Sequence, residues 1–231
     1  MKYYISEYFE SLQGEGMYAG TKALFIRFHF CNLACCWCDT KYTWLKKSGT
    51  YEESSKQQLI NLIQNNNSTH IVFTGGEPAL YKLDELVCEG KEYHVESNGM
   101  FLPDEPLDVM LSDGTNLKRE AMKEDIIKHF NWVISPKLSN SGQETDNAFL
   151  EYWKEKEYCI FKFIIIDNKD LQEVNDTVNK YGILKSRVYV GLEGTTMESQ
   201  LRPEMVDIIL NNGFNYSPRL QILLWGAERG K

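Results

Sequence analysis

Strand-like and helix-like segments alternate along most of this chain of 231 residues. Short apolar runs predict strands at residues 23–30, 71–74, 93–97, 132–135, 159–166, 187–192 and 220–224. Apolar residues three to four apart predict helices at residues 56–64, 80–89, 119–128, 146–156, 171–181 and 202–211. This alternation indicates parallel strands joined by right-handed crossovers. A closed eight-stranded barrel takes about 250 residues. We therefore expect an incomplete, open TIM-like α/β barrel of about six parallel strands, forming a single domain over residues 1–231.

Composition excludes several classes of protein. Hydrophobic residues make up 42% of the chain and charged residues 25%, which is typical of a folded domain. No apolar run approaches the roughly 20 residues of a membrane-spanning helix, and the first residues lack the apolar core of a signal peptide. The net charge is −8, with no basic stripe of the kind that binds nucleic acid. We expect a cytoplasmic protein that binds neither membranes nor nucleic acid.

Polar residues and glycines follow the predicted strands one after another. Cys31 follows the first strand, and further examples are TGGEP at 74–78, ESNG at 96–99, SPK at 135–137, Asp167 and GLEG at 191–194. The carboxyl ends of parallel strands meet at one rim, where such folds carry their sites. The sequence therefore predicts one large site at this rim.

Four of the six cysteines, Cys31, Cys35, Cys36 and Cys38, fall within eight residues. A disulfide framework would spread them along the chain, so the cluster indicates metal binding. The CxxxCxxC spacing of Cys31, Cys35 and Cys38 suits three corners of a cubane iron–sulfur cluster and leaves the fourth iron open, whereas electron-transfer clusters take four cysteines. Structural zinc with Cys36 as fourth ligand, or free thiols, are the alternatives; Cys35 and Cys36 are adjacent, so their side chains diverge.

The CxxxCxxC motif after a strand, Trp37 before its last cysteine, and GGEP at 75–78 together resemble the radical S-adenosylmethionine (SAM) superfamily. The resemblance implies a [4Fe-4S] cluster on Cys31, Cys35 and Cys38, with SAM bound to the open iron. One-electron cleavage of SAM would then yield a 5′-deoxyadenosyl radical that abstracts hydrogen from a substrate.

Additional motifs narrow this resemblance. SLQGEG at 11–16, CNLACCWCDT at 31–40, TGGEP, ESNG and SPK resemble the 7-carboxy-7-deazaguanine synthase family. The resemblance implies a lyase of queuosine and 7-deazapurine biosynthesis. It would convert 6-carboxy-5,6,7,8-tetrahydropterin to 7-carboxy-7-deazaguanine with release of ammonia, through hydrogen abstraction at C6 and Mg²⁺-assisted ring contraction. It also implies a homodimer and a flavodoxin or ferredoxin as electron donor.

Roles for individual residues follow from the same resemblance. It assigns substrate contacts to Leu12, Gln13, Gly14, Glu15, Arg27 and Thr74, and Mg²⁺ binding to Thr40. It assigns SAM contacts to Trp37, Asp39, Gly75, Gly76, Glu77, Ser97, Asn98, Ser135, Pro136, Lys137, Leu192, Glu193 and Gly194.

The residue types suit these roles. An arginine at position 27 can clamp a carboxylate through two hydrogen bonds, and Gln13 and Glu15 complement ring nitrogens. The two glycines of GGEP allow close backbone approach to a ligand. Thr40 has a simpler alternative role as the cap of the following segment.

Two other functions remain open at this point. A radical SAM activase of a glycyl-radical enzyme would share the cysteine motif, although Asp39-Thr40 replaces the histidine-asparagine common after that motif. A non-enzymatic iron–sulfur or zinc protein would not need the residues at the strand ends. His29, His70, His94 and His129 match no catalytic pattern, and no residue stands out as a strong general base.

Overall fold

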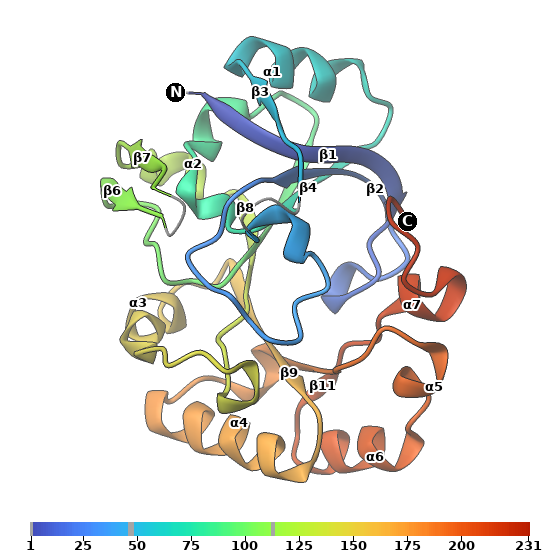
Figure 1. Ribbon diagram of the computed structural model, residues 1–231. Coiled ribbons are helices and arrows are strands. Elements are labelled where there is room, and N and C mark those ends of the chain that lie inside the picture. Colours follow the sequence, from blue (N-terminus) through green and yellow to red (C-terminus); the bar gives the residue numbers. More distant parts are fainter. Residues whose placement is uncertain (1, 46–48, 112–113) are drawn as a thin grey trace.

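One nine-stranded sheet organises the computed structural model, which describes residues 2–45, 49–111 and 114–231 (Figure 1). From one edge to the other its strands are β11 (Asn215–Tyr216), β10 (Val188–Leu192), β9 (Cys159–Ile165), β8 (Phe130–Ile134), β5 (Glu92–Ser97), β4 (His70–Gly75), β2 (Lys22–Phe28), β1 (Tyr3–Leu12) and β3 (Glu52–Ser54). All neighbours from β11 to β2 pair in parallel, whereas β1 runs antiparallel to β2 and β3 antiparallel to β1. Among the described residues β11 and β3 do not pair with each other, so the predicted open barrel is confirmed.

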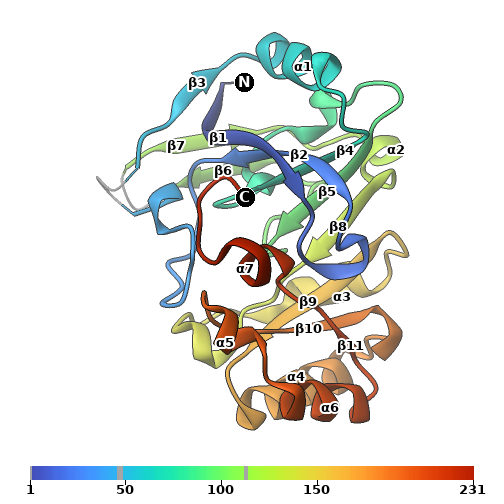
Figure 2. The same cartoon turned by 90° about the vertical axis from the view of Figure 1, so that its right-hand side faces the viewer.

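Seven α-helices are found among the described residues. They are α1 (Lys56–Asn65), α2 (Glu124–Ile127), α3 (Leu150–Lys154), α4 (Asn168–Tyr181), α5 (Met197–Gln200), α6 (Pro203–Asn211) and α7 (Leu220–Trp225). The longest, α4, begins after Asp167, whose carboxylate accepts from two backbone N–H groups, and ends at the left-handed Gly182. Both views place α4 beside α6, outside β9 and β10 (Figures 1 and 2).

The apolar runs predicted most of the parallel strands correctly because these strands are buried on both faces. The predicted strand at 220–224 is wrong: this segment is helix α7. Only Ile222 of α7 is buried, so the helix lies on the surface with one face inward. A five-residue apolar run does not distinguish the two structures without its tertiary neighbours.

Three predicted helices differ from the structure. In place of the helix predicted at 80–89 there are short 3₁₀ helices at Pro78–Leu80 and Leu83–Leu86. Their leucines are all fully buried, so this segment lacks the polar face of a surface helix. In 119–128 only α2 is α-helical, and Arg119 ends a strand, β7 (Asn116–Arg119), which pairs with β6 (Leu107–Met110). The buried Arg119 guanidinium donates to the carbonyls of Leu102 and Pro103, which fixes the end of β7 to the turn before β6. In 146–156 a 3₁₀ turn, Asn147–Phe149, precedes α3.

The core lies between the sheet and its outer helices, and it includes the buried, tilted rings of Trp132 and Trp153, 4.9 Å apart. None of the helices within residues 2–45, 49–111 and 114–231 combines the length and apolar character needed to cross a membrane.

Candidate active site

A cavity of about 250 Å³ opens at the carboxyl ends of the parallel strands. The predicted site residues that line it are Leu12, Gln13, Gly14, Glu15, Arg27, Cys31, Cys35, Trp37, Cys38, Asp39, Thr40, Thr74, Gly75, Gly76, Ser97, Asn98, Ser135, Lys137 and Glu193. Glu77, Pro136, Leu192 and Gly194 do not line it. The single rim that the sequence predicted therefore exists.

The loop that carries the cysteines begins with an unusual backbone conformation. Phe30 has a φ of 72°, the left-handed region that non-glycine residues seldom adopt. It is held there because its N–H donates to the Thr43 carbonyl at 2.7 Å and its carbonyl accepts from Glu77 N–H at 2.8 Å. This turn directs the chain from β2 into the loop, so that Cys31 reaches the cavity.

The far side of this loop is fixed to the segment after β8. Trp37 Nε1 donates to Asn140 Oδ1 at 3.1 Å, and Cys36 N–H donates to the Ser141 carbonyl. Cys36 is exposed, bonds through Sγ to the Asn140 carbonyl and does not line the cavity. Three cysteines thus face the cavity and the fourth faces away.

The arrangement of the three thiols fits an iron–sulfur cluster better than one zinc ion. Tetrahedral zinc, with bonds of about 2.3 Å, holds its sulfurs roughly 3.8 Å apart. Within the described residues, Cys31, Cys35 and Cys38 do not form a group whose ligand atoms all lie within 4.8 Å of one another. Burial raises the pKa of Cys31 to about 12 and also raises that of Cys35, so these thiols need a bound cation to ionise. Trp44 Nε1 lies 3.3 Å from Cys38 Sγ, where it can donate to a thiolate.

The two glycines after β4 allow close packing against β2. A Cβ at Gly75 would lie 2.2 Å from the Phe28 carbonyl oxygen, and one at Gly76 would lie 1.9 Å from that of Phe30. Both positions therefore require glycine because the turn after β4 packs directly against the backbone of Phe28 and Phe30, whether or not a ligand is bound. Gly75 also has a φ of 128°, which favours glycine.

Glu77 is fully buried and supports the rim from beneath. Its carboxylate accepts from Ala79 N–H, Asn98 N–H and the Ser97 hydroxyl at 2.7–2.8 Å. Burial nevertheless raises its pKa. Glu77 thus connects the turn after β4 to the end of β5 and fixes the backbone of Ser97 and Asn98 at the cavity edge.

Lys137 brings a positive charge to the cysteine side of the cavity. Its ammonium donates to the carbonyl and hydroxyl of Ser135 at 2.8 and 2.9 Å and lies 5.6 Å from the centre of the Trp37 ring. Burial lowers its pKa, which the nearby Cys35 thiol partly opposes. Two of its three N–H groups are thereby used, and one is left for a ligand.

A buried group of charges forms the other side of the cavity. Lys162 Nζ lies 2.7 Å from Glu15 Oε2 and 3.5 Å from Glu96 Oε2, and Gln13 Nε2 donates to Glu96 Oε1 at 2.8 Å. Burial alone would raise the pKa of Glu15, but the charges of Lys162 and Arg219 outweigh it and lower that pKa to about 2. Glu15 is therefore an anion that can accept hydrogen bonds throughout the physiological range.

Helix α7 lies between the β1–β2 side and the β9–β10 side of the sheet (Figure 2). Arg219, just before it, bonds to Glu15 and Asp39 and donates to the Gly194 carbonyl at 2.7 Å. Gln221 Nε2 donates to Glu15 at 2.8 Å, while its buried Oε1 has no partner within the described residues. That oxygen lies against Gly14, where an added Cβ would be 1.7 Å from it, so it is closed to a ligand in the cavity.

Arg27 reaches the cavity from β2. Its Nε donates to Glu7 Oε1 at 2.8 Å, and Glu7 also accepts from the Tyr42 hydroxyl and Arg229. No other hydrogen bond of this guanidinium is found in the part of the chain described, which leaves Nη1 and Nη2 for an anion. Arg229 thereby fastens the C-terminal tail, whose last residue, Lys231, also lines the cavity.

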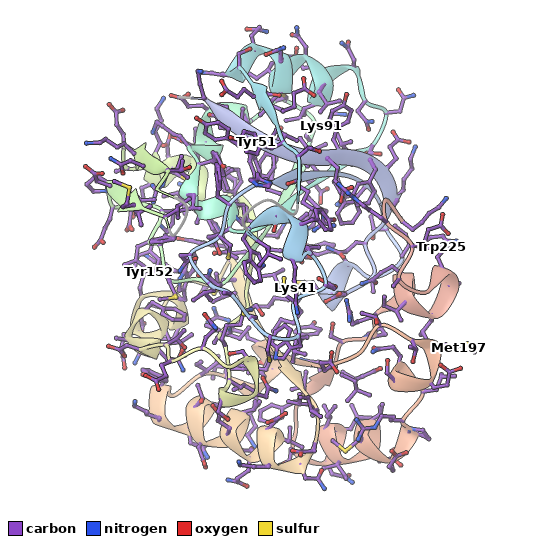
Figure 3. The ribbon with its side chains drawn as sticks, viewed as in Figure 1. Lys41, Tyr51, Lys91, Tyr152, Met197 and Trp225 are labelled. Carbon is purple, nitrogen blue, oxygen red and sulfur yellow. The ribbon has the colours of Figure 1, made fainter. Side chains whose placement is uncertain are left out.

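Thr40 precedes a 3₁₀ helix, Lys41–Thr43, but its side chain does not cap that helix. Its hydroxyl lies 3.5 Å from Cys38 Sγ and lines the cavity. Figure 3 places Lys41, the next residue, at the centre of the face, between the N-terminal strands and the C-terminal helices. The capping alternative for Thr40 is therefore not found, and its hydroxyl faces the cavity instead.

Five charged or polar residues of the cavity were not predicted: Glu96, Lys162, Arg219, Gln221 and Lys231. Lys162 had a signal, because a lysine interrupts an otherwise apolar buried strand. Gln221 lies in the segment whose structure was predicted wrongly and Arg219 directly precedes it, so their position could not be inferred.

Comparisons with known proteins agree with this geometry. A profile of the radical SAM superfamily matches residues 25–137. The 7-carboxy-7-deazaguanine synthase of Pyrobaculum aerophilum is 31% identical over 235 residues, covering 98% of this chain and 96% of the relative. That of Rhodopirellula baltica is 30% identical over 236 residues, covering 98% and 88%.

A solved structure supports the fold. The crystal structure of QueE from Escherichia coli superposes with a TM-score of 0.66 and 22% sequence identity, covering 94% of this chain and 93% of that one. The 31% identity to a relative over nearly its whole length, with the radical SAM profile match, means that the chain belongs to the 7-carboxy-7-deazaguanine synthase family of the radical SAM superfamily.

Proposed function

We propose that this chain converts 6-carboxy-5,6,7,8-tetrahydropterin to 7-carboxy-7-deazaguanine, with release of ammonia, as a single radical SAM domain. One observation carries the proposal: a single cavity joins three inward-facing thiols to a buried set of complementary hydrogen-bonding groups. The curated relatives named 7-carboxy-7-deazaguanine synthase support the choice of substrate.

The cysteine side of the cavity has the residues to hold both cofactors. Cys31, Cys35 and Cys38 would hold a [4Fe-4S] cluster, and the free N–H of Lys137 would bind the carboxylate of SAM. When bound, these groups supply a one-electron cleavage that generates a radical able to take hydrogen from C6 of the substrate. The protein's part is to position the substrate against them and to exclude water.

The other side of the cavity suits a carboxylated pterin. The free Nη1 and Nη2 atoms of Arg27 would bind its carboxylate through parallel hydrogen bonds. Glu15, which lines the cavity, would accept from its ring N–H and amino groups. Because Lys162 and Arg219 hold Glu15 ionised, this acceptor is in place before the substrate arrives.

We further propose that Thr40 binds Mg²⁺ together with oxygens of the substrate. Mg²⁺ takes hard oxygen ligands and is commonly completed by substrate and water. Support comes from the Thr40 hydroxyl, which caps no helix and faces the cavity. Thr40→Val should raise the Mg²⁺ concentration needed for half-maximal turnover about tenfold or more. Thr40→Ser keeps the hydroxyl and should need the same Mg²⁺ concentration as the wild type. The same Mg²⁺ requirement in both variants would argue against Mg²⁺ binding here.

The proposed enzyme works in the cytoplasm as a homodimer and takes electrons from a flavodoxin or ferredoxin. Exposed apolar side chains support the dimer: Met197 and Trp225 project from the same side of the molecule, on α5 and α7 (Figure 3). Leu201, directly after α5, and Leu224, next to Trp225, are also exposed. Light scattering should give a particle of twice 26.8 kDa, and a monomer would contradict the dimer.

The activity test is anaerobic. The reconstituted protein receives dithionite, SAM, Mg²⁺ and 6-carboxytetrahydropterin, and mass spectrometry follows the products. We expect 7-carboxy-7-deazaguanine with little net loss of SAM. Formation of 5′-deoxyadenosine without that product would keep radical SAM chemistry but refute the proposed substrate.

Arg27 tests the substrate end separately. Arg27→Gln should raise KM for the pterin about 10- to 100-fold, because a charge-assisted bond contributes roughly 1.5–3 kcal/mol, while SAM cleavage without substrate stays unchanged. Arg27→Lys, which keeps the charge but not the planar fork, should recover only part of the affinity. An unchanged KM in Arg27→Gln would remove Arg27 from the substrate site.

A further inference from the structure

A second group of potential ligands lies at the start of β4 and β5, at the opposite ends of these strands from the cysteine loop. His70 and Glu92 begin the two strands and are partners in the parallel register. His94 follows two residues later on β5, so it lies on the same face as Glu92. None of the three lines the active-site cavity.

The ligand atoms of these residues converge. His70 Nδ1 lies 2.9 Å from His94 Nε2 and 3.7 Å from Glu92 Oε2. A tetrahedral cation with bonds of about 2.0–2.1 Å holds its ligand atoms roughly 3.3 Å apart. Within the described part of the chain, this is the only trio of histidine, cysteine or acidic residues whose ligand atoms all lie within 4.8 Å of one another.

Packing fixes the inner part of this group. His94 is only 2% exposed, and the ring of Tyr18 meets it edge-on at 4.3 Å between centres. Tyr18 is itself held by Asn131, which accepts from its hydroxyl at 3.1 Å. Burial, together with the nearby His70, lowers the pKa of His94 to about 4, so the ring is a neutral imidazole near pH 7.

The outer part is open to solvent. The Glu92 side chain is 56% exposed and that of His70 20%. A cation can therefore enter from this side, and water can complete its coordination. The group thus combines one buried nitrogen, one half-buried nitrogen and one accessible carboxylate.

We propose that His70, Glu92 and His94 form a second metal site, which binds a divalent transition-metal ion such as Zn²⁺ through His70 Nδ1, His94 Nε2 and a Glu92 carboxylate oxygen. Two imidazoles and a carboxylate are donors that Zn²⁺ accepts, whereas Mg²⁺ and Ca²⁺ favour oxygen ligands alone. The ion joins the beginnings of β4 and β5. His94 is two residues from Glu96 at the cavity wall, so the ion braces the strand beneath the substrate end.

Zinc binding to the cluster-loaded protein tests this proposal, because iron then occupies the three cysteines. Equilibrium dialysis against Zn²⁺ near pH 7 gives the stoichiometry and affinity, and zinc X-ray absorption gives the ligand types. We expect one tightly bound zinc per chain with a shell of nitrogen and oxygen and no sulfur. His70→Gln should weaken binding at least about 100-fold and Glu92→Gln at least about 10-fold, since even outer ligand partners are worth 10- to 100-fold.

Glu151→Gln is the matched control, because the Glu151 side chain is 58% exposed and lies on α3. It should leave zinc affinity unchanged. Glu92→Gln carries the test by itself if His70→Gln fails to fold, since its side chain is mostly in solvent. The proposal is overturned by the absence of stoichiometric zinc, by sulfur in the zinc shell, or by wild-type affinity in Glu92→Gln.

Discussion

Replacing Lys162 by methionine should destabilise the protein strongly, because it leaves Glu15 and Glu96 without their shared cation. The Lys162 side chain is 9% exposed, and those of Glu15 and Glu96 are 13% and 23% exposed, so solvent screens these charges little. The pKa of Glu15 falls from 4.5 to about 2 in the folded protein. At about 1.4 kcal/mol for each tenfold change in acidity, this shift corresponds to a net stabilisation of the anion by about 3 kcal/mol, an order-of-magnitude figure in which Lys162 and Arg219 outweigh the cost of burial. Losing one partner of a buried pair typically costs 3–5 kcal/mol, so we expect the free energy of unfolding to fall by about 3 kcal/mol.

Urea unfolding of the cluster-free chain at pH 7 measures this loss. Lys118→Met is a matched control: Lys118 lies 2.7 Å from Asp108, the same distance as Lys162 from Glu15, but the two side chains are 68% and 60% exposed. An exposed pair is worth less than about 1 kcal/mol. Adding Glu15→Gln to Lys162→Met should recover part of the stability, because one uncompensated charge is removed. Equal losses in Lys162→Met and Lys118→Met would refute the reasoning.

Three further predictions concern pH, packing and closure of the site. The pKa of Glu15 is lowered on folding, so its contribution to stability is complete above about pH 5 and is lost as the pH falls toward 2. The free energy of unfolding, measured as a function of pH, should show this loss in the wild type and not in Glu15→Gln. Gly76→Ala should cost more than about 2 kcal/mol in urea unfolding, since the new Cβ meets the Phe30 carbonyl oxygen. Gly90→Ala should cost only about 1 kcal/mol, because that glycine has a φ of 75° but open space around it; the reverse order would contradict the packing. Arg219→Ala should lower kcat/KM about 10- to 100-fold by freeing α7, with iron content unchanged; full activity would show that α7 needs no such anchor.

The parallel part of the fold was predictable because its strands are buried on both faces and therefore appear as continuous apolar runs. The same reasoning missed β1 and β3, whose antiparallel positions at one edge have no helix between strands to announce them. It also misjudged α7, since that short segment is held by Arg219 and Gln221 reaching residues some 200 positions earlier in the chain.

The residues of the candidate site likewise fall into those that local sequence predicts and those that only the fold brings together. Local motifs predicted the cysteine loop and the glycine turn, because each depends on residues adjacent in sequence. The group of charges around Glu15 comes from four separate segments, and sequence spacing alone does not bring Lys162 and Arg219 together. Only the position of a lysine inside an apolar strand indicated that a buried anion had to be near.

The central claim is that the three-cysteine cavity carries out radical chemistry on C6 of a carboxylated pterin. The most direct test is turnover of 6-carboxytetrahydropterin that carries deuterium at C6, with SAM and product recovered under anaerobic conditions. The account predicts 7-carboxy-7-deazaguanine together with deuterium in the recovered SAM. Product without deuterium in SAM or 5′-deoxyadenosine, or no product from protein with a full cluster, would contradict it.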